Sequence, residues 1–339
     1  MAKGSMFHFN TPVRIRAAAG VVGKSEAEGP IGDCFDLYDK TDRFGQKTWE
    51  MAESEMQRLA LRRALSKAGI GEGEVDAMMA GDLLNQCVGS AYGLLDFTIP
   101  YFGLYGACST AVEGLLLGAV AVSSGHAACV ATVTSSHNSS AERQYRYPLE
   151  YGGQRSPTAQ WTVTGAGAFV LSADVGRVRL SRGMAGIVCD GGIKDVSNMG
   201  AAMAPAAADT LVRFFEATSS SPEGYDLILT GDLGHEGASI LRELMLVRGY
   251  DMGDRYGDCG LLIYDREGQD MHAGGSGCGC SAVVMASYLL PRMERGCYRH
   301  VLCMGTGAMM SPASLQQGNS IPAVAHLIQW DCDGEEERV

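Results

Sequence analysis

The sequence predicts an α/β protein built from two related halves, each with a mostly parallel sheet covered by helices. Short apolar runs that end in glycine alternate with stretches of helical periodicity, which is the pattern of strand–helix–strand units. One such unit turns sharply at Cys108, and the same order of patterns returns after Arg177. With 339 residues, of which 46% are hydrophobic and 19% charged, the chain can bury a substantial core.

Composition excludes several classes of function. The net charge of −12 and the lack of a basic stripe make nucleic acid an unexpected partner. The 11 cysteines are dispersed, many of them in apolar runs, so we expect reduced thiols. Cys278 and Cys280 form a C-x-C pair, but no second pair has the spacing of a structural zinc site. The longest apolar run, at 115–122, is too short to cross a bilayer, and we expect neither a membrane span nor a signal peptide.

The stretch before the cysteine turn predicts one helix between two strands. Ser54 and Gln57 form a capping box, apolar residues follow on one face, and Gly69 ends the helix. The expected elements are, in order, a tail at 1–10, a strand at 12–16, an insertion loop at 20–47, this helix, and a short buried strand at 76–80.

Cys108 is the centre of the predicted organisation. An apolar strand at 99–104 precedes it, and a buried helix at 111–122 follows and ends near Gly125. A cysteine at the start of a helix faces the positive end of the helix dipole, which favours a thiolate and any bound anion. The alternative is a buried, inert cysteine.

Three further segments complete the first half. A strand at 127–133 leads into a polar stretch that contains His137. Residues 141–161 form a long polar and aromatic excursion, and loops of this length in compact domains are usually functional or disordered. A buried strand is expected at 162–171.

The second half repeats the first. Residues 177–180 resemble 12–15, residues 226–233 resemble 76–83, and residues 280–284 resemble 108–112, all in the same order. We therefore predict one half at 1–176, with insertions near 20–47 and 141–161, and another at 177–339. Chance similarity between strand–helix–strand units is the alternative. Because ligands bind beyond the carboxyl ends of parallel strands, the glycine–aspartate and cysteine turns of both halves should surround one cleft.

Several stretches also resemble known families. The turn at 106–110, in a duplicated α/β chain, resembles the thiolase and ketoacyl synthase superfamily. Nearly the full length resembles one branch, the stage V sporulation protein AD family of endospore-forming bacteria. The stretches that carry this closer resemblance are 80–86, 106–110, 135–138, 146–148, 150–154, 157–167, 198–200, 203–207, 230–235 and 259–264.

The resemblance implies a fold and a role. It implies a thiolase-like five-layer αβαβα sandwich and the binding of dipicolinic acid (pyridine-2,6-dicarboxylate), free or as its calcium chelate. It further implies uptake of this compound into the developing spore. The implied partners are other spore inner-membrane proteins of the same operon and a second copy in a homodimer, with the chain peripherally associated with the cytoplasmic face of that membrane.

Catalysis is not expected. Condensing enzymes of the superfamily place a cysteine nucleophile beside a histidine and a second histidine or asparagine. Cys108 fits the nucleophile, but Asp232 stands where a histidine would be, and residues 276–280 contain no histidine or asparagine. We therefore predict a non-catalytic binder. An acyl transferase or condensing enzyme that uses Cys108, and a scaffold with a vestigial pocket, are the alternatives.

Hydrogen-bond donors near the strand ends are the candidate ligand contacts. His137 and His235 would add positive charge when protonated. Asp82 and Asp232 would suit a calcium ion that accompanies the ligand, or would only stabilise turns. The full predicted set is Cys108, Asp82, Asn85, Ser136, His137, Asn138, Asn198, Asp232, His235, Ser276 and Gly277.

Overall fold

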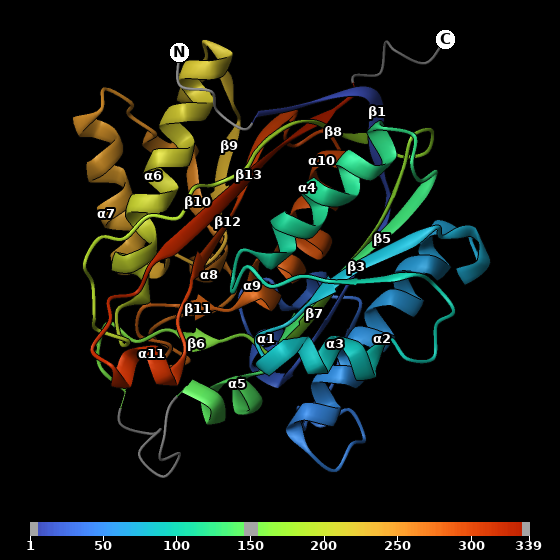
Figure 1. Cartoon of the computed structure of the whole chain (residues 1–339), viewed down its shortest axis with the longest axis horizontal. Coiled ribbons are helices and arrows are strands. Elements are labelled where there is room, and N and C mark those ends of the chain that lie inside the picture. Colours follow the sequence, from blue (N-terminus) through green and yellow to red (C-terminus); the bar gives the residue numbers. More distant parts are fainter. Residues whose placement is uncertain (1–5, 146–154, 334–339) are drawn as a thin grey trace.

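One long mixed sheet organises the molecule. The computed structural model describes residues 6–145 and 155–333 (Figure 1). Among them, the sheet has eleven strands in the order β10-β9-β12-β13-β8-β1-β7-β5-β3-β4, with β2 beside β1. The strands are β1 (Met6–Val22), β2 (Leu37–Tyr38), β3 (Ala77–Gly81), β4 (Tyr101–Gly103), β5 (Cys129–Ser136), β7 (Gly165–Ser172), β8 (Val178–Met184), β9 (Leu227–Thr230), β10 (Tyr256–Asp258), β12 (His300–Ala308) and β13 (Ala323–Cys332).

The strand order is symmetric about the β1–β8 pair. On one side the order is β1-β7-β5-β3-β4, and on the other it is β8-β13-β12-β9-β10. In each set the last three strands are parallel, whereas the first two pair antiparallel with their neighbours. The prediction of two separate, mostly parallel sheets was wrong, because β7 and β13 return antiparallel and β1 pairs directly with β8.

Helices form three layers, one outside each half of the sheet and one between the two halves. Together with the two halves of the sheet they give a thiolase-like five-layer fold (Figure 1). α2 (Trp49–Ala68) packs on β1, β5 and β7, and α6 (Met199–Thr218) packs on β12 and β13, with α7 (Gly234–Val247) beside it. Between the two halves, α4 (Thr110–Ser123) and α9 (Cys278–Val283) each contact strands of both. Three large clusters of buried apolar side chains fill the interfaces between these layers.

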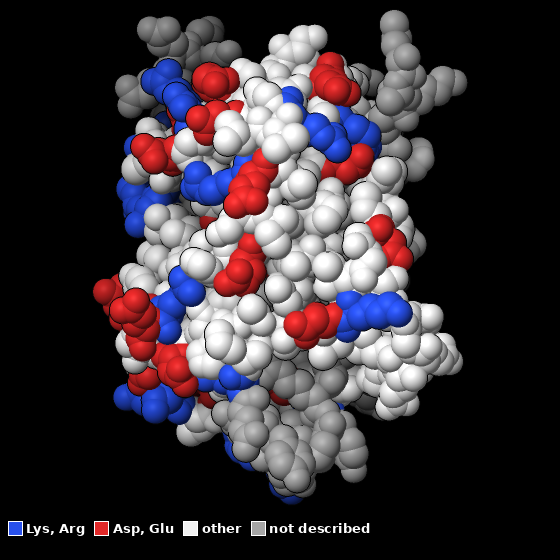
Figure 2. Space-filling view, turned by 90° about the vertical axis from the view of Figure 1, so that its left-hand side faces the viewer, with Lys and Arg blue, Asp and Glu red and all other residues white. Residues whose placement is uncertain are grey.

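The face that α6 and α7 cover carries acidic and basic side chains intermixed, without an extended basic area (Figure 2). Among the described residues, no helix combines the length and apolar character needed to cross a membrane. All 11 cysteines are free thiols.

The predicted helix before β3 begins earlier than expected. α2 starts at Trp49, because the Thr48 side chain accepts a hydrogen bond from the Met51 N–H at 3.2 Å and so caps the helix. Ser54 lies inside the helix, where its hydroxyl donates to the Glu50 carbonyl at 3.1 Å, so the capping box at Ser54 was wrong. The end at Gly69 is confirmed by its left-handed backbone, with φ of +66°.

Two predicted irregular segments are partly ordered. The tail prediction was wrong for residues 6–10, because β1 starts at Met6 and pairs with β8. The insertion at 20–47 completes β1 and contains α1 (Lys24–Ala27) and β2. Buried Glu26 accepts hydrogen bonds from the Tyr264 hydroxyl and the Thr164 N–H, and burial raises its pKa to about 7. These contacts tie the insertion to both halves.

The excursion at 141–161 begins with α5 (Asn138–Tyr145) and ends at β6 (Trp161–Thr162), which pairs with β11 (Gly275–Ser276). Its residues 146–154 lie outside the described residues. The strands expected at 12–16, 76–80, 99–104, 127–133 and 162–171 are confirmed in β1, β3, β4, β5 and β7, although β7 starts only at Gly165.

Both helices after the cysteine turns are present. α4 runs from Thr110 to Ser123, as predicted. In the second half, α9 continues through a π-helical turn, Val284–Leu289, into α10 (Leu290–Glu294). Pro291 has no backbone N–H to donate to this helix, which accounts for an irregular hydrogen-bond pattern there.

The start of α4 packs closely on β12 through glycine. A Cβ atom on Gly307 would lie 2.2 Å from the Gly106 carbonyl oxygen, and one on Gly305 would lie 2.8 Å from the Ser109 oxygen. Glycine at both positions therefore lets the cysteine turn rest on the second half of the sheet.

Gly307→Ala tests this contact. We expect the free energy of unfolding to fall by about 1–3 kcal/mol, because the added methyl group must displace the backbone of the cysteine turn. Urea unfolding followed by circular dichroism measures the change. Gly224→Ala is the control, since a Cβ there meets no heavy atom within 4 Å. Equal stability of the two variants would contradict the close packing.

Candidate functional site

Cys108 lies between β4 and α4, at the junction of the two halves. Its neighbour Ala107 has a φ of +50°, so the turn is tight and carries strain of the kind found at functional positions. The Cys108 side chain is buried, in a small cluster with Leu83, Ala141 and Cys278. The Cys108 side chain therefore packs against three other segments, which are the turn after β3, α5 and α9.

The Asp232 carboxyl group is the hydrogen-bond partner of this thiol. Asp232 follows β9, is fully buried, and accepts a hydrogen bond from the Cys108 thiol. The Thr306 hydroxyl on β12 donates to Asp232 Oδ1 at 2.8 Å, and the Gly277 N–H donates to Oδ2 at 2.8 Å. One carboxyl group thus joins the starts of α4 and α9 to strand β12.

Gly277 needs to be glycine for this contact. Its φ is +98°, a conformation that side chains rarely adopt, and a Cβ atom would lie 2.6 Å from Ser136 Oγ. The Ser136 hydroxyl itself donates to the Val163 carbonyl at 2.7 Å and accepts from the Gly279 N–H at 3.2 Å. The loop before α9 is therefore held against the end of β5.

Burial disfavours charge at this site. Burial raises the pKa of Asp232 to about 7, although the hydrogen bonds from Cys108, Thr306 and Gly277 lower it in part. Burial, followed by the Asp232 charge and the Cys278 thiol, raises the pKa of the Cys108 thiol well above its ordinary value. Since a reactive cysteine is a thiolate, this arrangement opposes nucleophilic attack by Cys108.

A second buried acid, Asp82, directly follows β3. Asp82 accepts hydrogen bonds from the Leu84 N–H at 2.8 Å and from both the N–H and hydroxyl of Ser90. The Gln57 amide joins Ser90 to Ser135, whose hydroxyl donates to buried Glu53 at 3.0 Å. Burial and the charge of Asp82 raise the pKa of Glu53. Asp82 therefore holds the turn after β3, which is the turn role that we gave as the alternative to a calcium contact.

Of the predicted ligand residues, the structure brings together Cys108, Asp232, Gly277 and Ser136, with Ser276 next to Gly277 in β11. His137 follows Ser136, but its ring bonds to the Asp42 carbonyl at 2.8 Å and lies 5.3 Å from the Trp49 ring. Burial lowers the pKa of His137, which opposes the positive charge expected there.

Four other predicted residues make contacts of their own, two through the side chain and two through the backbone N–H. Asn198 caps α6, because its side chain accepts from the Ala201 N–H at 3.2 Å. His235 is half exposed on α7 and pairs with Glu236. The Asn138 N–H donates to Thr164 Oγ1 at 3.1 Å at the start of α5. Asn85 is exposed, and its N–H donates to Gln144 Oε1 at 3.1 Å.

Sequence reasoning missed Thr306, Gln160 and Cys278 as parts of the site. The Gln160 amide donates to the backbone oxygens of Asp232 and Gly275, at 2.7 and 2.9 Å. The Cys278 thiol donates to the Ser135 carbonyl at 2.9 Å. Thr306 lies near the end of β12, which takes the place of β5 in the second half, so the internal repeat contained a signal for it.

Asp232→Asn tests the proton on the buried acid. Wild-type stability should fall as the pH rises from about 5 to about 7, by up to about 1.4 kcal/mol per pH unit, because the folded state keeps a proton that the unfolded state has lost. The variant lacks this contribution, so its free energy of unfolding should vary less over this range. Urea unfolding at several pH values measures both. Asp254→Asn, on an exposed carboxyl, should match the wild type, and equal slopes for all three would contradict the assignment.

Solved structures share this architecture. The 3-oxoacyl-(acyl-carrier-protein) synthase III of Aquifex aeolicus VF5 is 13% identical and superposes with a TM-score of 0.57, over 94% of this chain and 99% of that chain. Cerulenin-bound OleA of Xanthomonas campestri is 14% identical, with a TM-score of 0.60, over 97% of this chain and 100% of that one. At such identities the likeness concerns the fold alone.

Sequence relatives are closer. Stage V sporulation protein AD of Bacillus subtilis (strain 168) is 42% identical over 327 residues, which are 96% of this chain and 96% of that protein. A model of the family described as Stage V sporulation protein AD matches residues 4–331. The chain therefore belongs to the Stage V sporulation protein AD family of sporulation proteins.

Proposed function

We propose that this chain binds dipicolinic acid during spore formation and does not catalyse a reaction. The observation that carries the second part is the buried Asp232 carboxyl group bonded to the Cys108 thiol. The first part is supported by the family and by a site that is rich in hydrogen-bond donors. An acyl transferase that uses Cys108 is the alternative that the fold invites.

Acyl transfer needs two conditions that the site opposes. Cys108 would have to lose its proton, yet burial and Asp232 both raise its pKa. The negative charge that develops on a thioester or enolate oxygen would then have to be stabilised by nearby donors. An ionised Asp232 would repel that charge, and the Thr306 hydroxyl and Gly277 N–H are already directed to Asp232.

Binding of a small dianion has favourable features here. The protein has a net charge of −12, so affinity has to come from local donors. The N-termini of α4 and α9 both lie at the site, and their positive dipole ends favour a carboxylate. Asp82, one of the two acids expected to meet calcium, is occupied by Leu84 and Ser90. We therefore propose that hydrogen-bond donors recognise the acid in its free form.

Calorimetry with dipicolinate tests the binding. We expect saturable binding that weakens as the pH rises through about 7, because an ionised Asp232 repels the dianion. Asp232→Asn should remove this pH dependence and bind at least tenfold more tightly than wild type at pH 8, while Cys108→Ala should weaken binding.

The controls separate specific binding from general anion binding. Asp254→Asn should behave as wild type, and pyridine-3,5-dicarboxylate, which has the same charge and a different shape, should bind at least tenfold more weakly. A flat dipicolinate titration with folded protein at both pH 6 and pH 8 would overturn the proposed ligand.

Acyl-thioesters test the absence of catalysis. Incubation with acetyl- and lauroyl-coenzyme A should leave the intact mass unchanged, since Cys108 stays protonated. Alkylation of the exposed Cys297 by iodoacetamide is the positive control for thiol chemistry, and it should precede any reaction of Cys108. A stoichiometric acyl adduct that is absent from Cys108→Ala would instead establish the acyl transferase.

A further inference from the structure

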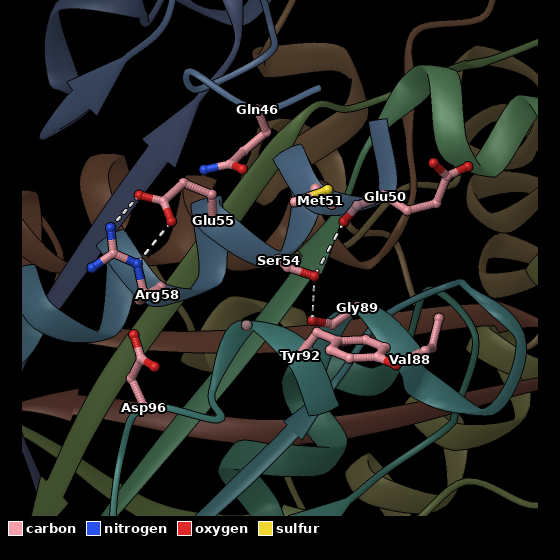
Figure 3. Close-up of a pocket in the computed structure, with 11 residues that line it drawn as sticks. Gln46, Glu50, Met51, Ser54, Glu55, Arg58, Val88, Gly89, Tyr92 and Asp96 are labelled. Carbon is pink, nitrogen blue, oxygen red and sulfur yellow. Dashed lines mark hydrogen bonds and ion pairs between the residues drawn. The ribbon is translucent and has the colours of Figure 1, made fainter. Parts of the chain in front are cut away.

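An apolar groove runs along α2 and α3 (Val88–Gly93) on the outer surface of the first half (Figure 3). Its volume is about 500 Å³. Met51, Val88 and Tyr92 line it and are 50%, 37% and 70% exposed. Large apolar side chains grouped around one groove are typical of a contact surface.

In the second half, α7 covers the corresponding surface of α6. α3 follows β3 as α7 follows β9, and both precede the edge strand of their half. α7 has 14 residues and buries Gly237, Ala238, Leu241 and Met245 mainly against α6. α3 has only six residues, so it covers much less of α2.

In each helix pair, a glycine of the second helix lies against the backbone of the first. A Cβ atom on Gly237 would lie 2.7 Å from the Gly200 oxygen of α6, and one on Gly93 would lie 2.5 Å from the Ser54 oxygen of α2. The Ser54 hydroxyl also donates to the Gly89 carbonyl at 3.0 Å (Figure 3). Glycine thus brings each second helix close to the first, but in the first half the second helix stops at this contact.

We propose that the groove binds an amphipathic helix of a partner protein, in the place that the additional turns of α7 take on α6. The groove would receive apolar side chains spaced three or four residues apart, as α7 presents them to α6. The exposed ring of Tyr92 would contact the same face of the partner helix.

Charge at the rim defines the partner further. Three acids, Glu50, Glu55 and Asp96, line the groove, with Arg58 as its one lining basic residue. Arg58 is bonded to Glu55, and Arg143 reaches Glu50 from α5 at 3.2 Å. Asp96 is exposed at the end of the groove. With Arg143 counted, the rim has one more acidic than basic side chain, which favours a helix with lysine or arginine beside its apolar stripe.

A designed peptide probes the groove directly. A fluorescein-labelled helical peptide of about 15 residues, with leucines at helical spacing and lysines beside them, should give saturable anisotropy with the full-length protein. Met51→Ala with Tyr92→Ala should weaken binding at least tenfold, and Asp96→Lys should weaken it and reduce its dependence on salt. Leu246→Ala, which removes an exposed leucine from α7, is the control and should leave binding unchanged.

Three results would overturn the proposal. One is equal binding of a peptide in which glutamates replace the lysines. Another is binding that the Met51 and Tyr92 substitutions do not change. The third is a concentration-dependent dimer, measured by sedimentation velocity, that Tyr92→Ala dissociates, because the groove would then be filled by a second copy of the chain.

Discussion

The carboxyl group of Asp232 is the contact on which the centre of the molecule depends. It follows β9, yet its hydrogen bonds come from the start of α4, from β12 and from the loop before α9. Each donor satisfies part of a buried polar group that would otherwise destabilise the fold. Glycine at 277 and 307 permits these contacts, because side chains there would push the segments apart. The same contacts therefore form the site and hold the two halves together.

The burial of Asp232 beside Cys108 has a chemical effect. Condensing chemistry needs a cysteine that ionises readily, whereas here burial raises the pKa of both Cys108 and Asp232. Glu26 and Glu53 follow the same pattern, because burial raises the pKa of each. Burial thus favours the uncharged form of several acids in the interior. Such an interior suits recognition by hydrogen bonding better than nucleophilic catalysis.

Local signals predicted much of the fold. Gly69 ended α2, and the apolar run before Cys108 and the helix after it were visible because they are continuous in sequence. The start of α2 was misplaced, since both Thr48 and Ser54 are residue types that cap helices. In the fold only Thr48 caps α2, and the Ser54 hydroxyl donates to the carbonyls of Glu50 and Gly89 instead. For the site, the aspartate and cysteine turns could be matched through the internal repeat. The ring of His137 could not be placed, because its partner Asp42 lies in a distant segment. The Asn198 cap is local, on the Ala201 N–H three residues later, but we assigned this side chain to the ligand.

Strand β1 has a consequence for how the molecule folds. It is 17 residues long and pairs with β7 along one edge and with β8 along the other. Detaching either half would leave a long row of unpaired backbone groups on its inner strand. The two halves should accordingly melt as a single cooperative unit. Many of the stabilising contacts join residues far apart in the chain. We therefore expect this architecture to fold more slowly than a helical bundle of similar size.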